Sequence, residues 1–167
     1  MQSIEFVVDR IYREESGRLH AYLLSKVGND FQLAEDALHD AIVKAIELWK
    51  IDGMPKNPAG WLAITARNRA VNELLRQNRH SKKAEEIELW ISESDDGVSF
   101  NDSVFPDERL RLIFTCCHPS LSWEAQVGLT LRTVCGLSIE QILSDFLIPV
   151  STLTQRLVRA KRKSGRK

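Results

Sequence analysis

The sequence predicts an all-α protein, and three observations indicate this fold class. Apolar residues recur at helical spacing along almost the whole chain, no segment alternates apolar and polar residues, and Gly, Pro and Asn-Pro signals divide the chain. Together these signals predict about six or seven helices. With 167 residues, 43% hydrophobic and 28% charged, the chain has the composition of a globular protein that can bury a core.

The N-terminal sequence and the cysteines bear on the cellular compartment. No stretch approaches the ~18 consecutive apolar residues of a membrane span, and the first ten residues lack the layout of a signal peptide. The three cysteines, Cys116, Cys117 and Cys135, are odd in number and two are adjacent, so a secreted-type disulfide framework is not expected. We therefore expect a cytoplasmic protein that has no membrane partner.

The formal net charge is zero, but the charges are segregated along the chain. Residues 67–83 hold six Lys and Arg against one acid, and residues 156–167 hold seven Lys and Arg and no acid. Between these blocks, residues 84–108 hold nine acids and no Lys or Arg. Two basic blocks therefore flank an acidic one.

The acidic part of the chain also marks a domain boundary. Residues 81–105 are rich in Ser, Asp and Glu and have only scattered apolar residues, which is typical of a linker. We expect two small helical domains, residues 1–80 and residues 106–167, joined by this linker. A domain of ~60 residues buries only ~60% of its unfolded surface, so docking between the two domains, or onto a partner, is expected to matter.

The segment 31–49 is predicted to be an amphipathic helix. Its inward stripe comprises Leu38, Ile42, Ala45 and Trp49, and its acidic edge comprises Asp36, Asp40 and Glu47. An acidic edge does not favour DNA. A protein partner and an ordinary solvated helix face both fit this pattern.

The next helix is predicted from Ala59 to about Arg79, with Asn57 as its cap and Pro58 at its first position. Its buried row comprises Leu62, Ala66, Ala70 and Leu74, and its outer row comprises Arg69, Asn72, Arg76, Arg79 and Lys83. Such a row could follow a nucleic-acid backbone. Asn68 and Asn72 could pair with exposed bases, and Trp61 could stack on one, although a tryptophan taken alone is more often a core residue.

The C-terminal segment resembles a helix-turn-helix. Residues 138–141, Ser-Ile-Glu-Gln, fit a capping box at the start of a short helix. Residues 147–149, which include Pro149, end this helix, and Ser151 can cap the next one. Leu153, Leu157 and Ala160 are expected to face inward, and Thr152, Gln155, Arg156, Arg159 and Lys163 lie on the opposite side. Short polar side chains could reach base edges, and Arg and Lys could neutralise phosphates. The alternative is a solvated basic helix end, which the helix dipole favours anyway.

Cys116, Cys117 and His118 have the chemistry of zinc ligands, but adjacent ligands without a CxxC spacing are a weak signal. We predict instead a pair of buried thiols that end a helix before Pro119, and no metal or cofactor. The chain has no Gly-rich phosphate loop, no HExxH and no GxSxG, so we do not expect an enzyme. A metal- or thiol-dependent enzyme centred on Cys116 and His118 is the weaker alternative.

Two stretches carry a family resemblance. "FQLAEDALHDAIVKAIELW" followed by "NPAGWLAITARNRAVNELLR" resembles region 2 of bacterial sigma factors of the extracytoplasmic function group, and "LSWEAQVGLTLRTVCGLSIEQILSDFLIPVSTLTQRLVRAKRK" resembles their region 4. The run "RLRLIFTCCHPSLS" resembles a subgroup that usually carries a further helical C-terminal domain. The resemblance implies a sigma factor that brings core RNA polymerase to promoter DNA, with an anti-sigma factor or a C-terminal regulatory domain as a further partner.

The resemblance also implies roles for individual residues. The helix with Asp36, His39 and Asp40 would bind the clamp helices of the polymerase β′ subunit, and the β flap would be a second polymerase contact. The helix with Trp61, Asn68, Arg69, Asn72 and Arg76 would recognise and help melt the minus-ten element. Thr152, Gln155, Arg156 and Arg159 would read the minus-thirty-five element. The main alternative is a stand-alone helix-turn-helix repressor or activator, which would bind duplex DNA tightly without polymerase.

Overall fold

A computed structural model describes residues 3–28, 30–79, 106–146, 155–160 and 162 of the chain. The described residues form helices and no strand, which confirms the predicted all-α fold class. The helices are α1 (Ile4–Val27), α2 (Phe31–Asp52), α3 (Pro58–Asn78), α5 (Pro106–Cys116), α6 (Trp123–Thr133) and α7 (Ile139–Phe146). Residues 155–160 form a further stretch of helix.

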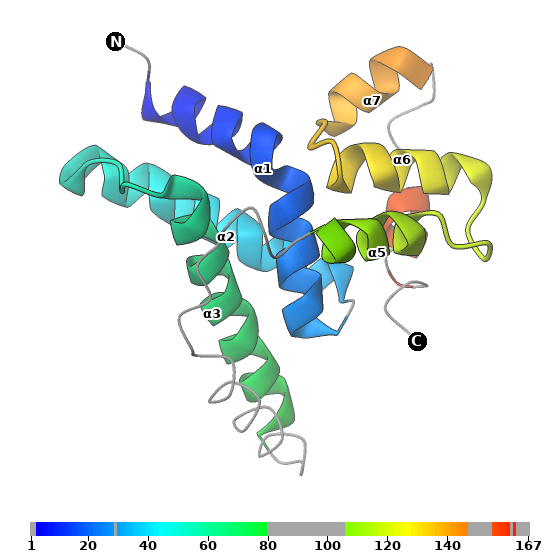
Figure 1. Cartoon of the computed structure of the whole chain (residues 1–167), viewed down its shortest axis with the longest axis horizontal. Coiled ribbons are helices and arrows are strands. Elements are labelled where there is room, and N and C mark those ends of the chain that lie inside the picture. Colours follow the sequence, from blue (N-terminus) through cyan, green and yellow to red (C-terminus); the bar gives the residue numbers. More distant parts are fainter. Residues whose placement is uncertain (1–2, 29, 80–105, 147–154, 161, 163–167) are drawn as a thin grey trace.

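The first three helices pack together as a bundle, drawn in blue, cyan and green in Figure 1. Each of them begins at a polar cap: Ser3, Asp30 and Asn57 accept a hydrogen bond from a backbone N–H three residues later. Their apolar faces form the core, whose fully buried large side chains include Leu19, Leu23, Phe31, Leu38 and Leu62. Burying each such side chain contributes about 1.5–3 kcal/mol. This packing holds α2 and α3 side by side.

The capping box predicted at the start of α7 is confirmed. The backbone N–H of Gln141 donates to Ser138 Oγ at 3.2 Å, and the backbone N–H of Ser138 donates to Gln141 Oε1 at 2.9 Å. In the last helix Leu157 and Ala160 are buried as predicted. The predicted turn at residues 147–149, its cap Ser151 and the inward Leu153 lie outside the described residues.

Helix α1 lies between the two halves of the chain in Figure 1 and contacts both. On one side it packs against α2 and α3, and on the other against α5 and α6. The buried side chains of Leu112 in α5 and Leu129 in α6 belong to the same hydrophobic cluster as those of the first bundle. The core is therefore continuous through α1. The proposed linker, residues 81–105, lies outside the described residues, and the domain boundaries stay a prediction.

None of the helices described here has both the length and the apolar character needed to cross a membrane.

Candidate functional site

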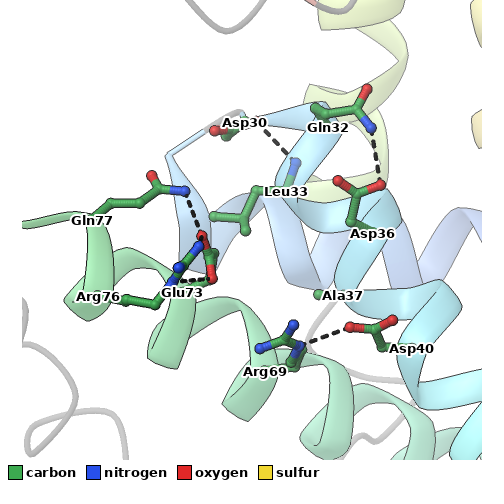
Figure 2. A pocket seen from close by; sticks show the side chains of 10 residues that line it. All are labelled: Asp30, Gln32, Leu33, Asp36, Ala37, Asp40, Arg69, Glu73, Arg76 and Gln77. Carbon is green, nitrogen blue, oxygen red and sulfur yellow. Dashed lines mark hydrogen bonds and ion pairs between the residues drawn. The ribbon is translucent and has the colours of Figure 1, made fainter.

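A groove of about 330 Å³ runs between α2 and α3, and Figure 2 shows the side chains that line it. Those of α2 and its cap are Asp30, Gln32, Leu33, Asp36, Ala37 and Asp40, and those of α3 are Arg69, Glu73, Arg76 and Gln77. The acidic edge predicted on α2 and the basic row predicted on α3 thus share one groove. From the sequence we expected two separate surfaces.

An ion pair joins the two helices across this groove. Arg69 Nε donates to Asp40 Oδ2 at 2.7 Å, and both side chains are more than half exposed (55% and 52%). The hydrogen bond to Asp40, together with the negative charge of Asp40, raises the pKa of Arg69. Asp40, which was expected to contact protein, therefore pairs with Arg69, which was expected to contact DNA.

Arg76 pairs with Glu73 on its own helix. Its Nε donates to Glu73 Oε2 at 3.0 Å, its Nη2 donates to Glu73 Oε1 at 2.7 Å, and Gln77 Nε2 donates to the same Oε1 at 2.9 Å. The hydrogen bonds from Arg76 and then Gln77 lower the pKa of Glu73 to about 2. The Arg76 side chain is still 68% exposed, so the pairing leaves its cation accessible to a polyanion.

The remaining residues predicted on α2 and α3 lie as follows. His39 and Glu47 are exposed, and Asp36 accepts a hydrogen bond from Gln32 at 2.9 Å. Asn68 and Asn72 are exposed on α3, and Arg79, the C-cap of this helix, is also exposed. Lys83 lies outside the described residues.

Trp61, which was expected either to stack on a base or to belong to the core, is half-buried near the start of α3. Its ring meets that of the buried Trp49 edge to face, with centroids 5.3 Å apart and planes at 68°. This packing against α2 fixes the ring and leaves part of it at the surface. A stacking role stays a prediction.

A second basic surface lies where the last helix meets the start of α6. Arg156 and Arg159 line a hollow of about 350 Å³ there, together with Ser122 and Glu124. Arg159 is exposed and Arg156 is half-buried, while Gln155 is exposed beside them. Backbone hydrogen bonding and then the charge of Arg156 lower the pKa of Glu124. Thr152 and Lys163, the other two residues predicted on this face, lie outside the described residues.

The prediction of two buried thiols at Cys116 and Cys117 is wrong for the second. Cys116 is buried, and burial raises the pKa of its thiol to about 12, but Cys117 is exposed. Because successive helical residues point about 100° apart, the face of α5 that buries Cys116 leaves its neighbour outside. No group of three or more His, Cys, Asp or Glu side chains in the described part of the chain is placed to hold a metal ion.

Six residues that line the groove were not singled out from the sequence: Asp30, Gln32, Leu33, Ala37, Glu73 and Gln77. A signal for Glu73 was present, because Glu73 and Arg76 are three residues apart on a predicted helix and side chains at that spacing meet. The Asp40–Arg69 pair joins residues that are 29 positions apart and lie on different helices. No local sequence pattern predicts such a contact.

Comparisons with known proteins show the family of the chain. Residues 11–80 match the family described as Sigma-70 region 2. Over 133 residues, the chain is 31% identical to the ECF RNA polymerase sigma-E factor of Escherichia coli (strain K12), covering 75% of this chain and 69% of that protein. It is 36% identical over 137 residues to an uncharacterised protein of Rhizobium meliloti (strain 1021), covering 79% of this chain and 32% of that protein. The chain thus spans about a third of the length of the Rhizobium relative. No solved structure matches the chain.

Proposed function

Because this chain belongs to the extracytoplasmic function group of the sigma-70 family of sigma factors, we propose that it brings core RNA polymerase to a restricted set of promoters in the cytoplasm and takes part in transcription initiation. The observation that carries this proposal is the groove of Figure 2, in which an acidic edge and an exposed basic row lie side by side. An acidic protein-binding edge next to a cationic DNA-binding row suits a protein that must hold polymerase and promoter together.

In this proposal α3 recognises the minus-ten element and stabilises its melted form. The cations of Arg69, Arg76 and Arg79 remain exposed along one side of the helix and can follow the phosphate backbone. Asn68 and Asn72 are exposed on the same helix and have the donors and acceptors to read an unstacked base. The exposed part of Trp61 supplies a surface for stacking.

Helix α2 binds the clamp helices of the β′ subunit through its acidic edge. Asp36, His39 and Asp40 are exposed on consecutive turns, so a partner helix can reach all three. The exposed apolar side chains on α5, Leu110, Ile113 and Phe114, are spaced as one helix face and are our candidates for the β flap contact.

The last helix contacts the minus-thirty-five element. Gln155 can reach a base edge, while Arg156 and Arg159 neutralise phosphates, and Thr152 and Lys163 complete this set as residues of the same predicted face. We assign no catalytic residue to this chain, because the polymerase performs the chemistry in this scheme.

Transcription in vitro tests the proposal. Purified chain is mixed with bacterial core RNA polymerase and a library of genomic fragments, and we expect initiation on a small set of fragments only when the chain is present. Charge reversal at Asp36 and Asp40 should remove co-purification with core polymerase, and the matched reversal of Arg156 and Arg159 should spare it while removing initiation. Tight binding to duplex fragments without polymerase, and no initiation, would instead support a stand-alone regulator.

A further inference from the structure

A serine hydroxyl lies in the arginine-lined hollow between α6 and the last helix. Ser122 is the residue before α6; it is exposed, and its Oγ accepts a hydrogen bond from the backbone N–H of Ala125 at 3.4 Å. Arg156 and Arg159 line the same hollow, which has a volume of about 350 Å³. The hollow therefore places an accessible hydroxyl beside two cations that come from another helix.

The two arginines of this hollow lack a full counter-charge. Neither of them forms an ion pair with another residue in the described part of the chain. Glu124 also lines the hollow, and backbone hydrogen bonding and then the charge of Arg156 lower its pKa. Arg156 therefore already attracts an anion at the first turn of α6. Two positive charges against one carboxylate leave the described lining with a surplus of one positive charge.

A phosphoryl group on Ser122 would reverse this balance. At neutral pH a phosphoserine carries a charge of about −1.5 to −2 and three strong acceptor oxygens. Set against a surplus of one positive charge, it brings the net charge of the hollow to about −0.5 to −1. Guanidinium groups bind phosphate through paired, charge-assisted hydrogen bonds, so both arginines would be drawn to the modified serine and the hollow would repel a further polyanion.

We propose that Ser122 is a phosphorylation site, and that its phosphate withholds Arg156 and Arg159 from promoter DNA. This inference rests on the proposed function, in which these two arginines contact phosphates of the minus-thirty-five element. A protein serine kinase would transfer the γ-phosphoryl group of ATP. The bond between that phosphorus and the bridging oxygen breaks and ADP leaves, a bond to Ser122 Oγ forms, and the hydroxyl proton passes to a base of the kinase.

Mass spectrometry tests whether the site is used. The chain is isolated from its own bacterium during growth, in stationary phase and under heat, oxidative and envelope stress, and is digested with trypsin. Ser122 then lies in the peptide of residues 112–132, and fragment ions distinguish it from the other hydroxyl residues of that peptide. We expect phosphate on Ser122 in at least one of these conditions. An unmodified Ser122 in all of them would overturn the proposal.

A second experiment tests the contact with the arginines. The full-length chain is made with phosphoserine at position 122 by genetic-code expansion. The matched control carries phosphoserine at position 3, the N-cap of α1, where the neighbouring cation Lys50 already pairs with Glu5. Phosphorus NMR should give a lower pKa for the second phosphate proton at position 122 than at position 3, because two guanidinium groups favour the dianion. Adding Arg159→Gln should raise this pKa toward that of the control.

Promoter binding is then measured with core polymerase, on a fragment recovered in the transcription assay and over a range of salt concentrations. Phosphoserine at position 122 should weaken binding roughly tenfold or more and reduce the slope of log K against log salt by about 0.9 for each arginine withheld, and the control should do neither. Equal phosphate pKa values at the two positions, or unchanged promoter binding, would overturn the inference. If Arg156→Gln and Arg159→Gln still weakened binding, the proposed function would stand. If these two variants bound normally, the proposed role of the last helix would fail as well.

Discussion

At the scale of single residues, Arg69 links the two surfaces of the groove. Its guanidinium is exposed but already pairs with Asp40 at 2.7 Å. An exposed pair of this kind contributes little to stability, so a DNA phosphate can replace Asp40 at little cost. Under the proposed function, a polymerase contact with Asp40 would release Arg69 for the promoter by the same exchange.

Replacing Arg69 tests this role. Arg69→Gln should weaken promoter binding by the polymerase complex and reduce the slope of log K against log salt concentration by about 0.7–0.9, because one phosphate contact is lost. Fluorescence titrations over a range of salt concentrations measure the slope. Arg10→Gln removes an exposed cation of α1 outside the row and is the matched control. An unchanged slope in Arg69→Gln, or an equal loss in the control, would remove Arg69 from the DNA surface.

Glu108 gives the stability of the chain a pH dependence. It is half-buried on α5, burial raises the pKa of its carboxyl, and its Oε2 has no hydrogen-bond partner among the described residues. A carboxyl whose pKa is higher in the folded chain binds its proton more tightly when folded. The free energy of unfolding therefore falls as the pH rises above the ordinary value of 4.5.

Glu108→Gln should remove this loss. We expect the variant to melt at a higher temperature than the wild-type chain near neutral pH, and the difference to shrink as the pH falls toward the ordinary pKa of a glutamate. Circular dichroism melting at several pH values measures it. A difference of the same size at every pH would show that packing, and not the charge of Glu108, is responsible.

At the scale of elements, much could be predicted because the signals are local. Asn57 and Pro58 indicated the start of α3, and Ser138 with Gln141 indicated the start of α7; the hydrogen bonds of both caps confirm them. Burial at the end of α5 could be predicted only in part. Whether Cys117 is buried depends on which face of α5 packs on its neighbours, and local sequence does not report that.

The cap of α3 matters for the site because it fixes where the basic row begins. Asn57 Oδ1 accepts from the backbone N–H of Gly60 at 2.9 Å. Asn57→Ala should lower the free energy of unfolding by about 1 kcal/mol, and Asn57→Asp, which keeps an acceptor, should lower it by much less. Urea unfolding measures both. Equal losses in the two variants would mean that the side chain acts through packing and not as a cap.

At the scale of the whole molecule, segregated charge and helical periodicity predicted the basic and acidic surfaces but not how they meet. The groove depends on the pairing of Asp40 with Arg69, and Ser16 Oγ of α1 donates a hydrogen bond to the carbonyl oxygen of Thr133, 117 residues away. Such contacts follow from the packing of helices against one another, and no periodic pattern in the sequence predicts them. A local signal was present in Gly17, a glycine inside α1, since such a residue often marks a close approach.

The continuous core through α1 predicts that the two halves of the chain share their stability. Leu129 is fully buried in α6, and Leu129→Ala should cost about 2–5 kcal/mol at its own site. If the halves unfold together, the amides of α3 should also lose protection against hydrogen exchange. We expect this although α3 and α6 make no major contact with each other. Loss of protection confined to α6 would show that the halves are independent and that their contact through α1 contributes little to stability.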